Sequence, residues 1–417
     1  MTLVENSDSC VAQPIGVDGG PGVAWSIAAA VTVVASFVLS NAPTPLYLYW
    51  QSEWGVGSGA MTVVYSAYMA GLICTLSVAG SIADRYGRKI VLVPGLGAAA
   101  AASVLFLFAT NIFWLLPARV LTGVAVGAAL TAGLAATVDL APGSRKRTAA
   151  LIGSMSLVFG AGAGPLLSGV AASELRSPQT PAFSVVLILA LVALVVAIRL
   201  PLRRRTDKSA SPRGISWPSV PRNNRRHLLW GIATFAPGVT STSFVLSLGP
   251  AVLADGLGHS EPLLPGLTAF VMFLFASVTQ LALSKRSTRT HLLLSSLAAV
   301  ASMTALVCSL TLWPSPIVFA LAAVTAGAAQ SFGQLAGITL IATHVVDNRR
   351  AEANAALNIA GYFPAGLLAV VTGFAVDALG LAPAVFAFAV IVGSSAAVSL
   401  VLVRRSTAQC SADSLSA

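Results

Sequence analysis

The chain has 417 residues, of which 56% are hydrophobic and only 9% are charged. A soluble protein carries about 25% charged residues, so this composition excludes a soluble protein and favours the lipid bilayer as its surroundings. The formal net charge of +10 would favour nucleic-acid binding in a soluble protein. In a membrane protein it is explained by basic cytoplasmic loops, and we expect no nucleic-acid partner.

Neither a signal peptide nor a metal site is predicted. The first apolar run begins near Val23, after a tail with acidic residues but no Lys or Arg. A secretory signal begins with basic residues and ends at a small-residue cleavage site, so we expect this run to remain as the first membrane span. The four cysteines lie in tails or apolar runs without disulfide or metal-ligand spacing, and we expect no cofactor.

Twelve stretches are long and apolar enough for a helix across the membrane, which needs about 20 residues. Continuous apolar runs favour helices over the alternating strands of a barrel. The sequence therefore predicts an all-α membrane protein with twelve transmembrane helices. The predicted spans are residues 23–46, 59–83, 90–110, 113–138, 149–171, 181–201, 227–252, 263–283, 292–312, 317–341, 352–376 and 382–403.

The basic residues predict the orientation. With both tails in the cytoplasm, 22 of the 24 Lys and Arg residues lie in cytoplasmic segments, and only Arg119 and Arg176 remain. Cytoplasmic loops of membrane proteins carry this kind of excess. We therefore expect a multi-pass protein of the cytoplasmic (inner) membrane with both termini in the cytoplasm.

A basic segment rich in Ser and Pro divides the chain into two halves of six spans. "DLAPGSRKRTAALIGS" (139–154) and "DNRRAEANAALNIAG" (347–361) show a similar pattern at corresponding places of the two halves. Two pseudo-repeats around a central cavity are typical of a secondary transporter. The predicted parts are a cytoplasmic tail at 1–22, a six-helix bundle at 23–201, a cytoplasmic linker at 202–226, a second six-helix bundle at 227–403 and a cytoplasmic tail at 404–417.

The stretch "GSIADRYGRK" (80–89) places four charges between the second and third spans. Gly71 and Gly80 let another helix approach the second span, and Gly87 permits a tight reversal. Asp84 is suited to meet a helix N-terminus. The orientation explains the bases of this stretch, but it explains neither Asp84 nor the glycine spacing. The complete pattern is Gly71, Gly80, Asp84, Arg85, Gly87, Arg88 and Lys89.

This spacing resembles the signature loop of the major facilitator superfamily: Gly, eight residues, Gly, three residues, Asp, two residues, Gly, Arg, then Lys or Arg. The resemblance covers the whole chain in topology and mainly the first half in motifs. It implies that Asp84 docks on the start of span eleven near Glu352 and latches the outward-facing state, with Arg88 and Asp139 as partners. The corresponding turn at 283–291 has bases but no acid, so the implied latch is one-sided.

Arg119 stands in "RVLTGVAVG", near the outer end of span four. An arginine in an apolar helix is costly and normally faces protein or a water-filled cavity. Alternatively, since Pro117 is close by, it lies at the membrane edge and extends to the lipid headgroups. The superfamily carries an arginine followed by glycines at this point, so the resemblance implies a role of Arg119 in proton transfer.

Span five contains the string "GAGAGPLLSG", with Gly160, Gly164, Pro165 and Gly169. The glycines make a smooth helix face, and the proline removes one backbone donor and bends the helix. The string resembles the motif of exporters and antiporters of the same superfamily, although Ser168 stands where the family usually has glycine. The resemblance therefore implies an exporter of the drug or metabolite antiporter type.

Neutral polar residues interrupt several spans. "NAPTPLY" (41–47) and "PGVTSTS" (237–243) break spans one and seven at corresponding places, which indicates a transport pathway. Buried amides are hydrogen-bonded or hydrated, so the polar residues either line a cavity or join neighbouring helices. The cavity candidates are Asn41, Tyr65, Tyr68, Gln330 and Gln334, together with Asn354, Asn358 and Tyr362, which are spaced by four along one face of span eleven.

These features predict a secondary transporter and not an enzyme, because no nucleophile with a base, paired acids or metal ligands is expected at membrane depth. We expect a monomer that exports a small amphipathic compound by alternating access, with protons as the coupling ion. Apart from helix ends, no acid lies in a predicted span. Either the protein is therefore not a proton antiporter, or the coupling of transport to protons depends on Asp84, Asp139 and Arg119. The alternative is a proton-driven importer of a small organic solute.

Overall fold

The structure, a computed structural model, describes residues 22–202, 225–346 and 349–413. The described residues form helices and their connections, and twelve segments are long and apolar enough to cross a membrane. Lipid offers no hydrogen-bond partner to the backbone, and a helix satisfies its own N–H and C=O groups. The predicted all-α fold with twelve spans is confirmed.

The first half contains six spans, three of which are built from more than one helical segment; one of these three begins with the 3₁₀ turn η3 (Gly143–Arg145). The helices are α1 (Val23–Asn41), α2 (Tyr47–Trp54), α3 (Ser58–Tyr86), α4 (Arg88–Leu107), α5 (Ile112–Ala128), α6 (Leu134–Asp139), α7 (Lys146–Glu174) and α8 (Gln179–Arg199). A 3₁₀ turn, η1 (Thr44–Leu46), joins α1 to α2, and a π-helical turn, η2 (Ala129–Gly133), joins α5 to α6.

The second half repeats this order of spans. Its helices are α9 (Arg225–Ser247), α10 (Gly249–Ala251), α11 (Leu263–Leu283), α12 (Thr288–Cys308), α13 (Pro316–His344), α14 (Arg350–Leu379) and α15 (Leu381–Asp413). A π-helical turn, η5 (Val252–Gly256), follows α10.

The first span is longer than predicted. The prolines of "NAPTPLY" do not end it, because Pro43 and Pro45 stand at the start of the 3₁₀ turn η1, where a missing backbone donor costs little. The segment Val23–Trp54 therefore continues past the predicted end at residue 46. At the other end of the chain, α15 continues beyond residue 403 to Asp413, within the predicted tail. Most of the predicted linker at 202–226 lies outside the described residues.

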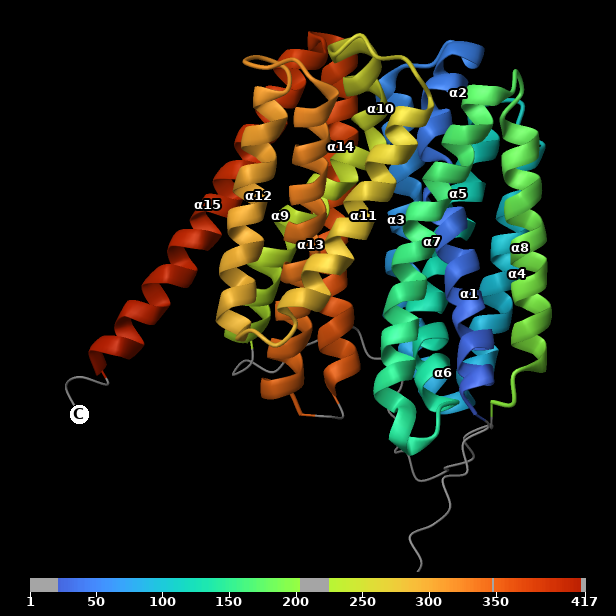
Figure 1. The fold of residues 1–417 in the computed structure, drawn as a ribbon, viewed down its shortest axis with the longest axis vertical. Helices are drawn as coiled ribbons and strands as arrows, with labels where there is room; N and C mark the ends of the chain where they lie inside the picture. The colour runs from blue at the N-terminus through green and yellow to red at the C-terminus, as the bar shows by residue number, and fades with distance from the viewer. Residues whose placement is uncertain (1–21, 203–224, 347–348, 414–417) are drawn as a thin grey trace, which may run out of the picture.

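The two halves stand side by side, with α1–α8 in one group and α9–α15 in the other (Figure 1). Two helix pairs make the main contacts between the groups: α3 packs against α14, and α7 packs against α11. Any space along these two seams is bounded by residues from both halves, so the seams locate the candidate site.

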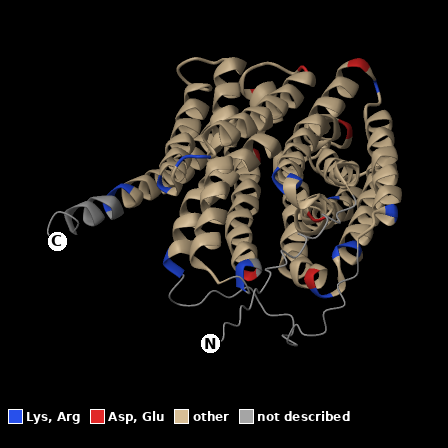
Figure 2. Cartoon of the chain, turned by 60° about the horizontal axis from the view of Figure 1, so that its bottom comes forward, with Lys and Arg blue, Asp and Glu red and all other residues tan. Residues whose placement is uncertain are grey.

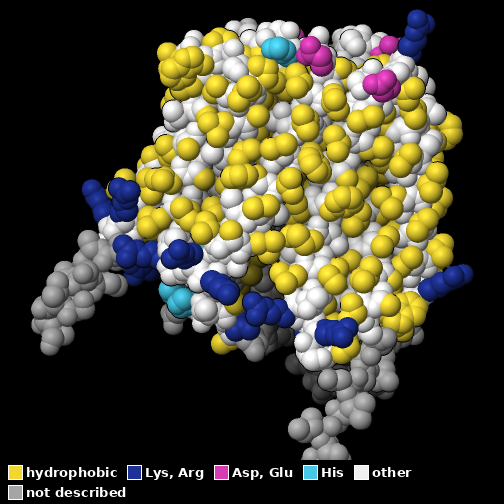
Figure 3. Space-filling model, in the orientation of Figure 1, with side chains coloured by type: hydrophobic (Ala, Val, Ile, Leu, Met, Phe, Trp, Pro, Cys, Tyr) yellow, Lys and Arg dark blue, Asp and Glu magenta, His cyan; other side chains and the backbone are white. Residues whose placement is uncertain are grey.

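Charges gather at the two ends of the helices, and an apolar belt separates them (Figure 3). We call the end where α3 ends and α4 begins the basic end, and Figure 2 turns this end toward the viewer to show its Lys and Arg residues. We call the opposite end the acidic end. Its acids are Glu53, Glu174, Asp255, Glu261 and Asp377.

Candidate transport cavity and gates

A cavity of about 70 Å³ lies between the two halves. Sites for organic ligands usually enclose about 300–1,000 Å³, so this conformation holds water-sized space and has to widen before it admits a substrate. The first half contributes Phe37, Ser40, Asn41, Tyr65, Tyr68, Met69, Leu130, Leu157 and Ala161. The second half contributes Val239, Thr242, Ser243, Leu246, Phe273, Gln330, Gln334 and Tyr362.

Six of the eight predicted cavity residues line this space: Asn41, Tyr65, Tyr68, Gln330, Gln334 and Tyr362. Two of them also join helices within one half. The Asn41 side chain donates to the Ala161 carbonyl at 3.2 Å, and the Thr242 hydroxyl donates to Gln330 Oε1. The sequence left open whether the polar residues line a cavity or join neighbouring helices. Asn41 and Gln330 do both.

The predicted stripe on span eleven reaches the cavity only at Tyr362. Asn358 and Asn354 lie four and eight residues earlier on α14, about 6 and 12 Å closer to the basic end at 1.5 Å per residue. Asn358 Nδ2 donates to the Asn354 carbonyl at 2.8 Å, and neither residue lines the cavity. The two asparagines therefore lie beyond the end of the cavity in this conformation, and their contact with a substrate stays a prediction.

Arg119 is completely buried in α5. Its Nη1 donates to the Ser40 carbonyl at 2.6 Å, and its Nη2 donates to the Tyr47 hydroxyl. The guanidinium carbon also lies 5.6 Å from the ring centre of Tyr65 and 5.8 Å from that of Tyr68, within the range of cation–π attraction. This burial rules out the interpretation of Arg119 as an arginine at the headgroups.

The charge of Arg119 is compensated by dipoles and rings. Among the described residues no carboxylate pairs with it, and its Nε has no hydrogen-bond partner. A buried cation without an anion is costly. Because Ser40, Tyr65 and Tyr68 contact Arg119 and also line the cavity, the positive charge stands directly behind the cavity wall.

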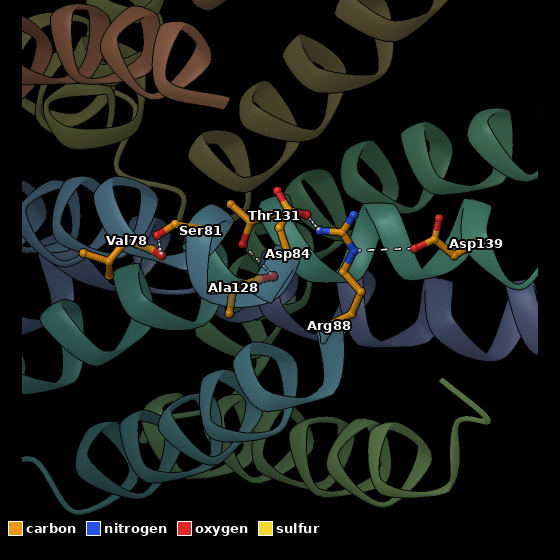
Figure 4. Close-up of polar contacts among 7 residues, drawn as sticks. All are labelled: Val78, Ser81, Asp84, Arg88, Ala128, Thr131 and Asp139. Atoms are coloured by element: carbon orange, nitrogen blue, oxygen red, sulfur yellow. Dashed lines mark hydrogen bonds and ion pairs between the residues drawn. The ribbon is translucent and has the colours of Figure 1, made fainter. Parts of the chain in front are cut away.

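The signature loop forms a small ion-pair network at the basic end (Figure 4). Arg88 Nη1 lies 2.8 Å from Asp84 Oδ1, and Arg88 Nε lies 3.5 Å from Asp139 Oδ2. Asp84 and Asp139 are 53% and 54% exposed, so the pairs contribute little to stability. Within the described part of the chain Asp84 has Arg88 as its one partner, and the implied docking on the start of α14 is not formed in this conformation.

The other residues of the signature have separate surroundings. Gly87 has φ of 100° at the turn between α3 and α4, where a side chain would be strained. A Cβ on Gly71 would lie 2.1 Å from the Val120 carbonyl oxygen, whereas a Cβ on Gly80 would meet nothing within 4 Å. Lys89 donates to the Leu200 carbonyl at 3.2 Å, and the Arg85 guanidinium lies 5.2 Å from the Tyr86 ring centre.

The glycines of the span-five string bring α7 close to two helices. On the α1 side, a Cβ would lie 2.7 Å from the Val34 carbonyl oxygen at Gly160 and 2.2 Å from that of Val38 at Gly164. On the α11 side, the backbones of Pro165 and Gly169 face Gly266, whose own Cβ would lie 2.5 Å from the Pro165 oxygen. The string therefore permits close packing within the first half and between the halves.

Asp377 is a contact between the halves that the sequence reasoning missed. Its two carboxylate oxygens accept the backbone N–H groups of Ser58 and Gly59, each at 2.8 Å. Asp377 belongs to the last turn of α14, and Ser58 and Gly59 begin α3, so the carboxylate satisfies free N–H groups at the positive end of the α3 dipole. The sequence feature that could have identified Asp377 is its position directly after an apolar run, one residue beyond the predicted end of the span at 376.

The approach of Asp377 to α3 depends on glycine. A Cβ on Gly57 would lie 2.6 Å from the carboxylate, and a Cβ on Gly59 would lie 2.8 Å from it. The Ser66 hydroxyl continues the seam deeper in the membrane by donating to the Gly366 carbonyl at 2.9 Å. Together these contacts close the two halves against each other at the acidic end, which makes Asp377 a candidate gate residue.

Parts of the chain are similar in sequence to known transporters. The "Triacylglyceride transporter" of Mycolicibacterium hassiacum is 35% identical over 151 residues, which is 36% of this chain and only 28% of that relative's length. The "4-hydroxybenzoate transporter PcaK" of Pseudomonas aeruginosa is 37% identical over 78 residues, 19% of this chain and 17% of that relative. The chain thus matches less than a third of the length of each of these relatives.

The whole fold is shared with solved transporters. The crystal structure of the nucleoside transporter NupG superposes with a TM-score of 0.68 at 10% identity, covering 90% of this chain and 98% of that one. The family model of the Major Facilitator Superfamily matches residues 28–303, which is more than half of the chain. With twelve spans in two halves around a cavity, the chain belongs to the Major Facilitator Superfamily.

Proposed function

We propose that the protein is a secondary transporter that moves a small amphipathic organic compound across the cytoplasmic membrane by alternating access. The observation that carries this proposal is the cavity between the halves, which has side chains from both halves in its lining and the Asp377 contact closing one end. A site at the interface of two repeats becomes accessible from alternate sides when one half rocks against the other.

By the positive-inside rule we assign the basic end to the cytoplasm, and we propose that both termini lie there. The Asp377 contact is then the outer gate, and the structure corresponds to a state closed on the outer side. Asp84, which is half exposed and held by Arg88, is free to dock on the partner half only when the cytoplasmic ends approach each other. The signature loop is therefore proposed as the latch of the opposite, outward-facing state.

The substrate class follows from the cavity wall. Three tyrosines and two phenylalanines supply aromatic surface, amides and hydroxyls supply hydrogen bonds, and among the described lining residues none is acidic. Arg119 adds a positive charge behind the wall. An aromatic compound that is neutral or carries one carboxylate is favoured by this combination. The name of the 4-hydroxybenzoate relative makes that acid the first compound to test.

Export coupled to protons is the direction we propose, because the α7 string has the exporter pattern and packs α7 on both α1 and α11. Arg119 is the proposed coupling residue, since it is a buried charge with no acidic partner among the described residues. Because a guanidinium keeps its proton, a helix-end carboxylate such as Asp84 or Asp139 has to carry the proton, and exchange of one proton for a neutral or singly anionic compound moves net charge across the membrane.

Purified protein in liposomes tests the proposal. We expect labelled 4-hydroxybenzoate or a related amphipathic compound to move faster with an imposed pH gradient than without one, and to move opposite to the protons. Movement in the same direction as the protons would assign an importer. No movement of any compound in a panel of aromatic acids and neutral amphipathic compounds, with correctly folded protein, would contradict the proposal.

A further inference from the structure

A second hollow lies on the outer surface of the seam between the halves. It has a volume of about 580 Å³ and is bounded by α7 and α11, with Val34 of α1 at its base. Its lining is almost entirely apolar, and several of its side chains are exposed, including Phe159 at 61% and Val278 at 54%. Figure 1 shows α7 and α11 next to each other at the boundary of the two halves.

The hollow runs lengthwise from the basic end toward the middle of the membrane. Its α7 wall extends from Thr148 to Phe159, and eleven steps at 1.5 Å per residue give about 16 Å. The hydrocarbon core of a bilayer is about 30 Å thick, so one leaflet is about 15 Å deep. The hollow therefore has the depth of a single leaflet and begins where that leaflet meets water.

Unpaired bases surround the entrance at the basic end. Arg145, Lys146 and Arg147 precede Thr148, and Lys285 and Arg286 follow Leu281, the last lining residue of α11. All five are exposed, and within the described residues none of them forms an ion pair. An apolar hollow with exposed basic side chains at its entrance is complementary to a molecule that has an apolar chain and an anionic headgroup.

The hollow and the transport cavity lie on opposite sides of the same wall. Leu157 and Phe273 line the cavity, whereas their chain neighbours Val158 and Leu274 line the hollow. A molecule in the hollow therefore touches the two helices that have to separate when the halves move. Neither the hollow nor the basic residues at its entrance depend on which compound the protein transports.

We infer that this hollow binds one acyl chain of an anionic membrane phospholipid, whose headgroup is held by the bases at the ends of α7 and α11. Bases near an anionic membrane surface attract such headgroups, and the apolar lining replaces the lipid neighbours of the chain. The site is distinct from the transport cavity and is expected to hold lipid in a transport-inactive variant as well.

Native mass spectrometry of the delipidated full chain tests this site with phosphatidylglycerol and phosphatidylcholine of identical chains. We expect the wild type to retain phosphatidylglycerol about tenfold more strongly. Ser156→Phe fills the hollow from the α7 wall and should reduce the retention of both lipids. Ser154→Phe is the matched control: both serines lie on α7 and bond the carbonyl four residues back, but Ser154 does not line the hollow.

Replacing Lys146, Arg147, Lys285 and Arg286 with Gln should remove the preference for phosphatidylglycerol, whereas Arg225→Gln with Arg226→Gln on α9 should leave it unchanged. If Ser156→Phe fails to fold, Val278→Phe fills the same hollow from the α11 wall. Equal retention of both lipids by the wild type, or unchanged retention when the hollow is filled, would overturn the inference. A wild-type protein that retains phosphatidylglycerol as expected but transports no compound of the panel would count against the proposed function alone.

Discussion

The contact of Asp377 with the start of α3 predicts that Asp377→Asn shifts the protein toward the state open at the acidic end. The carboxylate accepts two N–H groups at 2.8 Å, whereas an Asn side chain has one acceptor oxygen and presents an amide donor at the other position. One hydrogen bond is lost, and the other loses its charge assistance and its attraction to the helix dipole.

Hydrogen bonds to charged groups contribute about 1.5–3 kcal/mol and neutral ones about 0.5–1.5 kcal/mol. These values give a loss of about 1.5 kcal/mol or more, and because Asp377 is itself exposed to water, we discount it to about 1–2 kcal/mol. A tenfold change in an equilibrium constant corresponds to about 1.4 kcal/mol. The population ratio of the two states should therefore change about 5- to 30-fold, which is large enough to see if the minor state begins at a few per cent.

Spin labels at Ser52→Cys and Ser260→Cys, two exposed serines at the acidic end of different halves, report the separation of the halves in a background without the native cysteines. We expect Asp377→Asn to add a population at longer distance. The matched control is Asp255→Asn, which removes an exposed acid at the same end that has no ion-pair partner among the described residues. An unchanged distance distribution in Asp377→Asn, or the same change in Asp255→Asn, would refute the role of this contact as a gate.

Four further predictions concern the first half. Arg119→Lys should lower transport at least tenfold in proteoliposomes, because an ammonium cannot reproduce the forked donation of a guanidinium. The control Arg176→Lys changes an exposed arginine and should transport normally. Equal transport rates in the two variants would show that Arg119 has no role in the mechanism. Gly71→Ala should lower the unfolding temperature of the purified protein, since its Cβ meets backbone. Gly80→Ala should leave the unfolding temperature unchanged, because its Cβ meets no atom within 4 Å. It should impair transport, because we expect Gly80 to face the partner half in the outward-facing state. Equal lowering of the unfolding temperature in Gly71→Ala and Gly80→Ala would contradict this difference between the two glycines. Asp84→Asn should insert into the membrane normally, because the loop keeps its bases, and should slow transport; a wild-type rate would reduce the loop to a topology signal.

The fold was predictable because the bilayer imposes a simple rule on the sequence. Apolar runs of the length of a membrane span must form helices, and each of the predicted spans corresponds to one in the structure. The glycine of the signature pattern predicted the turn at Gly87. The resemblance implied Arg88, Asp139 and the start of α14 as partners of Asp84; in the structure Arg88 pairs with Asp84 and with Asp139, and the role of this network as a latch stays a prediction.

Contacts that depend on the relative depth and rotation of distant helices were less predictable. Arg119 of α5 donates to the hydroxyl of Tyr47, which begins α2 directly after the 3₁₀ turn η1, and the spacing of residues along the chain does not show that these two spans meet at this depth. Asp377 meets α3 only because the two halves close at the acidic end, and nothing in the local sequence around residue 377 names a partner more than 300 residues away. Asn354 and Asn358 share a helix face with Tyr362 but lie too near the basic end to reach the cavity.

The seam between α3 and α14 has a consequence for the speed of the transport cycle. Several of its contacts join a glycine of one half to a side chain of the other: Gly59 lies against Phe374, Gly366 against Met69 and Gly373 against Thr62. At each of these points only one side chain loses its packing when the halves separate, so less apolar area is uncovered than between two interlocked side chains. The hydrogen bonds of Asp377 and Ser66 then account for a larger share of the barrier, and we expect single substitutions at these contacts to change the turnover rate while the affinity of the cavity stays the same.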